Sequence, residues 1–379
     1  MRLTQASLRA HLVDELLPMW ARHGLDRAQG GYWNRLDARL APTPDGYKRL
    51  VVHARQLYAF SRAQELGAGA WAAEATAHGL EFLTRHFWDA SHGGWVLTTT
   101  DDGTPLDRTK DLYAQAFALF GLAEHHRVTR APESLRLARE TLALLRARMR
   151  EPRAGGFHER TSDDWRPLPG PRLQNPHMHL VEALLSLHGV APADGALDEA
   201  AALIELLASR WADPKTGALC ESFDARWQPA AGEAGQAVEP GHGFEWYALL
   251  RRFAELGGAG DRAPLAERLF GFAERHGIDA DGGVFDRVDR SGRPLHTRKR
   301  LWPQTEHLKA RALQAAVRPA ARPRLEAALE HCSKRYVDPA TGGWHEHLGR
   351  DGRVVSEAQN ATSVYHVVTA LGEVLKVAD

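Results

Sequence analysis

Two kinds of helical segment alternate along the whole chain. Segments such as Ala131–Met149 and Ala196–Trp211 are rich in Ala, Leu, Glu and Arg, which is typical of a helix with one solvated face. A second kind is more apolar, and its apolar residues recur at helical spacing, as in Leu112, Ala116 and Leu119. Six segments of this second kind begin near Lys48, Thr109, Asn175, Gly241, Pro303 and Thr362.

A glycine turn links the two kinds of helix and recurs six times at intervals of 60 to 65 residues. Glycine supplies positive φ there without steric cost. The copies are Gly30-Gly31-Tyr32-Trp33, Gly93-Gly94-Trp95, Gly155-Gly156-Phe157, Gly217-Ala218-Leu219, Gly282-Gly283-Val284 and Gly342-Gly343-Trp344. The polar stretches that follow alternate in character and predict short hairpins.

A fixed period over the whole chain indicates a repeat architecture. Two helices in each of six periods predict twelve helices, with the more apolar set inside and the Arg/Glu-rich set outside. We therefore expect an all-α fold, an (α/α)6 barrel whose β-hairpins gather at one end, because closing the ring buries the faces that an open array exposes. The repeat has no linker, so residues 1–379 are expected to form one domain.

Composition narrows the function. The formal net charge is zero and the pI about 7.4, which gives no electrostatic case for nucleic acid or an anionic membrane. The chain lacks a run of about 18 apolar residues, so no membrane span is expected. Cys220 and Cys332 are the only cysteines, which argues against a disulfide framework or a cysteine zinc site and predicts a cytoplasmic protein.

Polar residues concentrate at the beginnings of the apolar helices. Six equivalent helix starts in a barrel converge on one cavity, which makes these residues the default site. They are His53 and Arg55; Lys110, Asp111, Tyr113 and Gln115; Asn175, His177 and His179; His242 and Glu245; Trp302, Gln304 and Glu306; and Tyr365 and His366.

Most single histidines pack in a core or lie on a surface, but His179, His242 and His366 share one register in different repeats, which favours function. Glu245 follows His242 by three residues and could orient its imidazole. Arg55 could form an ion pair or contact a substrate oxygen.

Three histidines and two glutamates could also hold zinc or manganese. The chain has no HExxH motif, and its His-x-x-Glu order reverses that of carboxylate-bridged sites, so metal-free acid/base chemistry is favoured. His345 and His347 share a face of a predicted hairpin and are a weaker metal candidate. No cofactor is expected.

At these residues the chain resembles the N-acylglucosamine 2-epimerase superfamily, which includes sugar 2-epimerases and mannose-type aldose–ketose isomerases. The resemblance spans Arg55 to His366. Its phrases are Arg55-Gln56-Leu57-Tyr58-Ala59-Phe60, Asp111-Leu112-Tyr113-Ala114-Gln115, Asn175-Pro176-His177-Met178-His179-Leu180-Val181-Glu182-Ala183, Pro240-Gly241-His242-Gly243-Phe244-Glu245-Trp246, Trp302-Pro303-Gln304-Thr305-Glu306 and Tyr365-His366.

The resemblance implies an (α/α)6 barrel that moves protons beside a sugar carbonyl without nicotinamide. It implies that His242 and His366 are general acid and base, that His179 binds substrate or opens the ring, and that Arg55 faces the sugar oxygens. The other expected sugar-binding residues are Asp111, Tyr113, Asn175, His177, Glu245, Trp246, Trp302, Gln304 and Glu306.

The favoured reaction is isomerisation of mannose to fructose, because the apolar continuation after His366 looks more like the mannose isomerase branch. A 2-epimerase is the main alternative. An (α/α)6 glycoside hydrolase using two of Asp111, Glu245 and Glu306, or a binding protein without activity, is more remote. The partner is a small sugar, and the chain is expected to be a monomer or homodimer.

Overall fold

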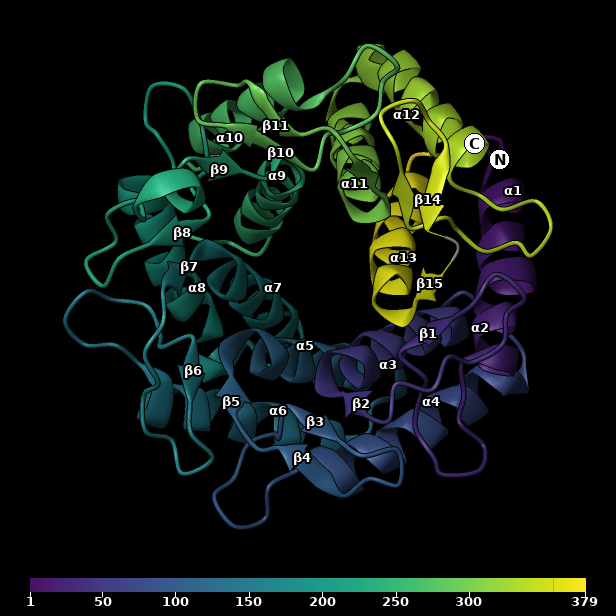
Figure 1. Cartoon of the computed structure of the whole chain (residues 1–379), viewed down its shortest axis with the longest axis vertical. Coiled ribbons are helices and arrows are strands. Elements are labelled where there is room, and N and C mark those ends of the chain that lie inside the picture. Colours follow the sequence, from purple (N-terminus) through teal and green to yellow (C-terminus); the bar gives the residue numbers. More distant parts are fainter. Residues whose placement is uncertain (357) are drawn as a thin grey trace.

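The computed structural model describes residues 1–356 and 358–379. Twelve helices of this part form two concentric rings, so the predicted (α/α)6 barrel is confirmed (Figure 1). The inner ring consists of α3 (Leu50–Glu65), α5 (Leu112–Thr129), α7 (Gln174–Val190), α9 (Pro240–Glu255), α11 (Leu301–Val317) and α13 (Ala361–Leu375). Each inner helix begins within three residues of the position expected from the sequence.

The outer ring begins with α1 (Gln5–Ala10) and α2 (Leu17–His23), which a π-helical segment, His11–Leu16, joins into one helix. It continues with α4 (Ala70–Phe82), α6 (Pro132–Leu144), α8 (Ala196–Leu206), α10 (Ala263–Gly277) and α12 (Arg322–Arg335). Outer helices bury one face, as the pattern predicts; α10, for example, buries Leu265, Leu269 and Phe270. The apolar core therefore lies between the two rings.

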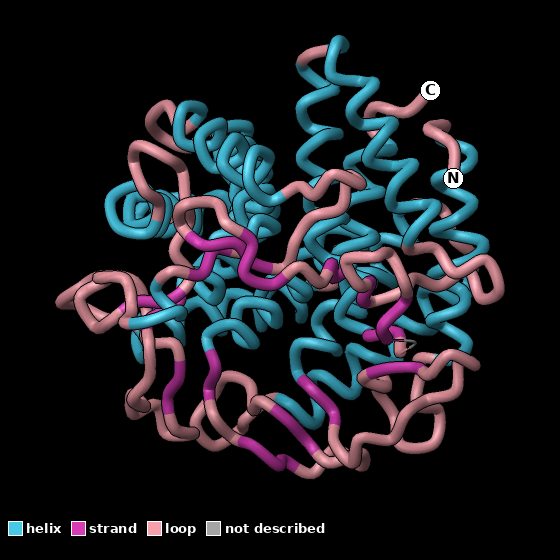
Figure 2. The backbone as a smooth tube through the Cα atoms, turned by 45° about the horizontal axis from the view of Figure 1, so that its top comes forward, coloured by secondary structure: helices cyan, strands magenta, loops and turns pink. Residues whose placement is uncertain are grey.

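Short strands collect at the end of the barrel where the inner helices begin (Figure 2). Each small antiparallel sheet joins a strand ahead of an inner helix to the strand after the glycine turn of the next repeat. The sheets are β2 (Lys48–Arg49), β3 (Thr98–Thr99) and β4 (Pro105–Asp107); β5 (Lys110–Asp111) and β6 (Arg160–Thr161); β7 (Arg172–Leu173) and β8 (Ser222–Phe223); β9 (Ala237–Val238), β10 (Arg287–Asp289) and β11 (Pro294–His296); β12 (Lys299–Arg300), β13 (His347–Leu348) and β14 (Val354–Ser356).

The sixth sheet closes the ring. It pairs β15 (Gln359–Asn360) of the last repeat with β1 (Arg35–Leu36) of the first, with Asn360 opposite Arg35. The amide of Ala361 also donates to the carbonyl of Asn34 at 3.0 Å. First and last repeats are therefore bonded in the same way as neighbouring repeats, so the inner helix starts all face one axis.

A buried side chain holds the glycine turn in four repeats. The Nε2 atom of His177 accepts the amide of Phe157 at 2.9 Å, while its Nδ1 lies 2.8 Å from the carbonyl of Leu173. His53 makes the equivalent contacts. Gln115 and Gln304 accept the equivalent turn amide through the side-chain oxygen and donate to the carbonyl of the same turn residue, and Gln304 also donates to the carbonyl of Arg300. We call these four residues the turn clamps.

The clamps explain a glycine of the signature, since a Cβ on Gly31 would lie 2.4 Å from Nε2 of His53.

A buried ion pair supports the same turn. Lys110 is fully buried, and its Nζ atom lies 2.7 Å from Asp89, whose other oxygen accepts amides of the turn. Equivalent pairs are Asp26–Lys48, Glu151–Arg172 and Asp279–Lys299. Lys110, which the sequence grouped with the cavity residues, is therefore engaged in supporting the turn.

No helix of residues 1–356 and 358–379 is both long and apolar enough to cross a membrane. Cys220 and Cys332 are buried free thiols. The cytoplasmic location stays a prediction.

Candidate active site

Three histidines on three inner helices present the same arrangement, with Nδ1 against a carboxylate. His242 on α9 lies 3.0 Å from Glu221, His366 on α13 lies 2.8 Å from Glu306, and His179 on α7 lies 3.0 Å from Glu182. A carboxylate at Nδ1 fixes the proton on that atom, so Nε2 is the atom left for chemistry. All three rings are buried.

His242 is held as an imidazolium. Burial alone lowers its pKa, but the carboxylate of Glu221 outweighs burial and, with Glu239 and Glu245, raises the pKa to about 9. Glu221 also accepts the side-chain amide of Gln174 at 2.7 Å and the backbone amide of Glu239 at 3.1 Å, which fix its position beside His242. Near neutral pH, His242 is a proton donor.

His366 is held neutral. Burial lowers its pKa, Glu306 opposes this and Arg55 adds to it, and the pKa settles at about 4. Its ring is therefore available as a base at neutral pH. Trp302 on α11 places it beside the acid, because the indole lies 4.9 Å from the ring centre of His242 and 5.7 Å from that of His366.

Hydrogen bonds and aromatic rings hold the side chain of Arg55 on α3 in place. Its guanidinium donates to the Tyr113 hydroxyl at 2.7 Å and to the Thr362 carbonyl at 3.1 Å, and it stacks 4.1 Å above Phe117 and 4.9 Å from Tyr365. Its Nε lacks a hydrogen-bond partner among the described residues. A fixed, buried cation of this kind suits an oxyanion that develops during reaction.

His179 lies on the same wall of the barrel. Its ring packs 5.1 Å from Tyr113 and 4.5 Å from Phe117, and burial lowers its pKa to about 4. Glu182 contacts both His179 and the hydroxyl of Tyr365. The structure thus brings His179, Arg55 and Tyr113 together, as the sequence predicts.

Some polar atoms on the inner helices α7 and α9 are buried and have no hydrogen-bond partner among the described residues. Both carboxyl oxygens of Glu245 and the side-chain oxygen of Asn175 have no hydrogen-bond partner within residues 1–356 and 358–379. Buried polar groups are nearly always paired with protein, water or ligand. These atoms are therefore suited to hydroxyl groups of a bound sugar.

Other predicted residues do not face the axis in this way. Asp111 is the N-cap of α5 and accepts the amide of Ala114 at 3.1 Å. Trp246 is fully buried and donates at 2.8 Å to Gln174, which in turn holds Glu221. Trp246 therefore supports His242 indirectly, through Gln174 and Glu221.

His177 and Gln304 are turn clamps, and the backbone uses their polar atoms. The sequence-based assignment of these two residues to the sugar is not supported by these contacts.

Sequence reasoning missed Glu221 and Lys309. A signal for Glu221 existed in the repeat, because the position four residues after the first glycine holds Glu159, Glu221, Asp286 and Glu346 in successive repeats. Each of these carboxylates accepts a backbone amide just ahead of its own inner helix. In the fourth repeat alone, a histidine lies close enough to pair with it.

The axis also contains two groups with metal-ligand types: His179, Glu182 and Glu245, and Glu245, Glu306 and His366, each with donor atoms within 4.8 Å. Glu182 and Glu306 are already paired, since Glu182 faces Nδ1 of His179, and Glu306 faces Nδ1 of His366 and lies 2.5 Å from the ammonium of Lys309. Glu245 is the member without a hydrogen-bond partner among the described residues. The donor set fits an ion-pair network better than a metal site.

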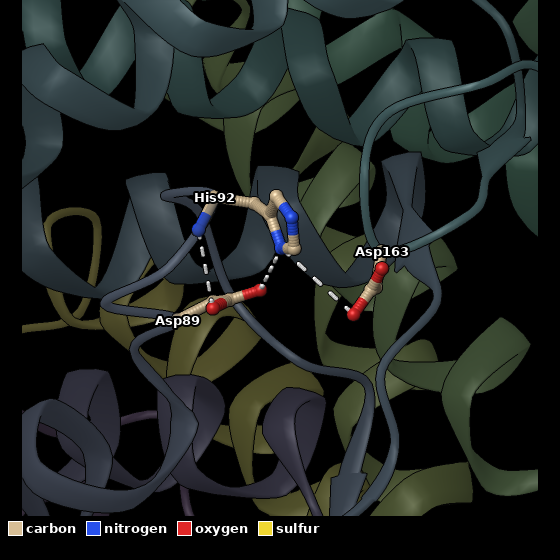
Figure 3. A group of neighbouring side chains, drawn as sticks. All are labelled: Asp89, His92 and Asp163. Atoms are coloured by element: carbon tan, nitrogen blue, oxygen red, sulfur yellow. Dashed lines mark hydrogen bonds and ion pairs between the residues drawn. The ribbon is translucent and has the colours of Figure 1, made fainter.

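A third such group lies away from the axis. Figure 3 shows the imidazole of His92 between the carboxyl groups of Asp89 and Asp163. Arg108 contacts Asp89 at 2.9 Å and Asp163 at 2.8 Å, and Lys110 contacts Asp89 as well. Arg108 and Lys110 therefore already pair with these carboxylates, and the ion pairs link the second and third repeats. The weaker metal candidate, His345 with His347, stays a prediction.

Comparison with known proteins agrees with this geometry. Residues 31–370 match the sequence profile of the N-acylglucosamine 2-epimerase (GlcNAc 2-epimerase) family. A mannose-6-phosphate isomerase of Rhizobium meliloti (strain 1021) is 36% identical over 386 residues, covering 98% of this chain and 96% of that protein. A cellobiose 2-epimerase of Bacteroides fragilis is 27% identical over 296 residues, 74% of each chain.

The structure of a cellobiose 2-epimerase from Spirochaeta thermophila DSM 6192 matches with a TM-score of 0.90 and 26% identity, covering 98% of this chain and 96% of that one.

Proposed function

The chain belongs to the N-acylglucosamine 2-epimerase family, and we propose that it is an aldose–ketose isomerase that converts a mannose-type sugar to the corresponding ketose. Its relatives support the broader assignment that the protein is an aldose–ketose isomerase or a sugar 2-epimerase that acts on a small sugar. The choice of isomerisation over 2-epimerisation rests on the unequal charges of His242 and His366.

The proposed reaction needs one base and one acid. The C2 proton of an open-chain aldose is weakly acidic, so an enzyme must place a neutral base beside it and stabilise the enediolate with fixed donors. His366 takes the C2 proton through Nε2. The imidazolium of His242 and the guanidinium of Arg55 face the developing charge on the sugar oxygens. His242 gives its proton to O1 and then takes the proton of the C2 hydroxyl, while His366 returns its proton to C1, so the product is a ketose and both histidines regain their starting charges.

Charge asymmetry favours isomerisation over epimerisation. A reversible 2-epimerase with two bases uses one histidine as base in the forward direction and the other in the reverse direction. A histidine with a pKa of about 9 is protonated near neutral pH and is a poor base there, whereas one with a pKa of about 4 is a ready one. This pairing is the observation that carries the proposal.

Sequence similarity supports the same choice. A relative that is 36% identical and covers 98% of this chain is named mannose-6-phosphate isomerase. We extend the proposed substrate class to free mannose and lyxose.

The test is product identification by NMR with D-mannose, D-mannose 6-phosphate, D-lyxose and cellobiose. We expect fructose or fructose 6-phosphate from the mannose substrates. Glucose without fructose would assign the protein to the 2-epimerases, and no turnover of any of these aldoses would overturn both. Substitution of His242 or His366 by Ala should remove activity while the thermal transition persists, which separates an enzyme from a sugar-binding protein.

A further inference from the structure

Three carboxyl groups from three inner helices meet at the barrel axis. Glu182 comes from α7, Glu245 from α9 and Glu306 from α11. Donor atoms of Glu245, Glu306 and His366 lie within 4.8 Å of one another. One ammonium enters this group: Lys309, one turn along α11, brings Nζ to 2.5 Å from Glu306. The lysine is itself buried.

Lys309 lies at the boundary between the candidate active site and a second cavity. That cavity has a volume of about 410 Å³ and is lined by the later turns of all six inner helices, at the end of the barrel opposite the strands. Glu182 and Lys309 both line it. Lys309 contacts Glu306, which in turn contacts His366, and the charge of Lys309 also helps to lower the pKa of His366.

Two neighbouring buried carboxyl groups do not both ionise readily, because like charges in a dry site repel. Lys309 decides which of them carries the charge. Burial raises the pKa of Glu306, but Lys309 and His366 outweigh it and bring the pKa to about 2. Burial, with Glu306 close by, raises the pKa of Glu245 well above its ordinary value. The lysine therefore favours the carboxylate form of Glu306.

The ionisation of Glu306 determines the tautomer of His366. A carboxylate can only accept, so Nδ1 carries the proton and Nε2 keeps its lone pair. A protonated Glu306 can donate to Nδ1, and the neutral ring then carries its proton on Nε2. In that second state the ring cannot take a proton from a sugar through Nε2.

We propose that Lys309 is a positioning residue whose ammonium keeps Glu306 ionised and thereby keeps the Nε2 atom of His366 free to act as a base. The inference rests on the proposed function for the role of His366, whereas the tautomer itself is a property of the free protein.

The remaining charged and titratable groups around this pair come from each neighbouring inner helix. They are Glu182 and His179 on α7, Glu245 and His242 on α9, Tyr365 and His366 on α13, and Arg55 on α3. Glu182, Glu245 and Glu306 all raise the pKa of Lys309, so the lysine stays charged over the working pH range. Arg55 lowers the pKa of His366, but its hydrogen bonds go to Tyr113 and Thr362, so it does not replace the contact of Lys309 with Glu306.

The test compares Lys309→Met with Lys309→Arg, which keeps the charge. Lys376→Met is the matched control, because Lys376 also lines the second cavity but is exposed and pairs with Glu373. Nitrogen NMR of the labelled free protein reports which ring nitrogen of His366 is protonated. The pH dependence of kcat and KM for D-mannose gives the second measurement. Lys309→Gln is the alternative uncharged variant if the methionine variant does not fold.

We expect the wild type, Lys309→Arg and Lys376→Met to carry the proton on Nδ1, and the uncharged Lys309 variants to carry it on Nε2 at neutral pH. Their kcat should fall by at least about tenfold at pH 7 and recover as the pH rises, by about tenfold per unit, with little change in KM. A wild-type tautomer in an uncharged variant overturns the proposal, whether or not any sugar is turned over. An equal loss of kcat at every pH also overturns it, because it indicates a structural role.

Discussion

Glu221→Gln tests whether one carboxylate sets the charge of the proposed acid. The substitution keeps the shape of the side chain and an oxygen that can accept the Nδ1 proton of His242, which now lies 3.0 Å from Glu221. It removes the negative charge that opposes burial. We expect the pKa of His242 to fall from about 9 at least to its ordinary 6.5.

The size of the effect follows from that change. A fall of about 2.5 pKa units corresponds to about 3.4 kcal/mol at 1.36 kcal/mol per unit. At pH 8 a group with a pKa of about 9 is about nine-tenths protonated, while one with a pKa of 6.5 is about 3% protonated. If the imidazolium is the active form, kcat/KM at pH 8 should fall roughly thirtyfold, and at about pH 6 it should change by less than about twofold.

The assay is the pH profile of kcat/KM for D-mannose, which reports groups of the free enzyme. Glu159→Gln is the matched control, since Glu159 occupies the same position of the third repeat and accepts the amide of Leu173 at 3.1 Å. It should leave the profile unchanged. An upper limb that stays near pH 9 in Glu221→Gln would refute the reasoning, and an equal loss at every pH would show that Glu221 only shapes the site.

Two further predictions concern the turn clamps and the buried arginine. Burial lowers the pKa of His177 to about 3, so its stabilising contribution is complete above pH 6.5 and is lost as the pH falls from 6.5 toward 3. His177→Gln, which introduces the residue found at the equivalent position Gln304, should remove about 2 kcal/mol of acid destabilisation at pH 5. His177→Ala should instead lower the free energy of unfolding by roughly 1–3 kcal/mol at neutral pH, because it leaves the amide of Phe157 unpaired. Denaturant unfolding at both pH values measures these changes, and equal behaviour of the two variants would contradict the prediction. Arg55→Lys cannot keep its contacts with Tyr113 and Thr362 together and should lose at least about tenfold in kcat/KM, the equivalent of about 1.5–3 kcal/mol for a charged hydrogen bond, with unchanged activity as the contrary result.

The repeat allowed the fold to be predicted. Glycine turns at a nearly constant interval predicted the number of helices, their order and the starts of the inner ring, because each turn is followed by short strands and then by one inner helix. The pairing of β1 with β15, which closes the ring, could not be predicted from the sequence, because these strands are two residues long and have no distinctive sequence.

The site was predicted only in part. Residues two apart on a helix point in directions about 200° apart, so neighbours at the same helix start serve different purposes. His177 and Gln304 hold turns, while His179 and Glu306 face the axis two residues later. The sequence alone put these four residues in one group, because only the packing of the helices shows which side chains point toward a turn and which toward the barrel axis.

The proton states of the histidines required the structure as well. His242 and His366 have opposite pKa shifts. The shared register expected from the sequence holds for His179 and His366, which are the sixth residues of α7 and α13, but it is wrong for His242, which is the third residue of α9; Glu245 occupies the equivalent position there. The difference comes from Glu221 and Arg55, which approach from other strands and helices. Only tertiary contacts separate the acid from the base.

The most direct test of the central claim is the rate of ketose formation from D-mannose by His366→Asn. Asparagine keeps a side-chain amide that can bond Glu306 but cannot take a proton, and general-base catalysis typically contributes about 10²–10⁴-fold. We predict a fall of at least about a hundredfold in kcat at every pH, with the thermal transition retained. A variant that forms ketose within about tenfold of the wild-type rate would contradict the assignment of His366 as the base.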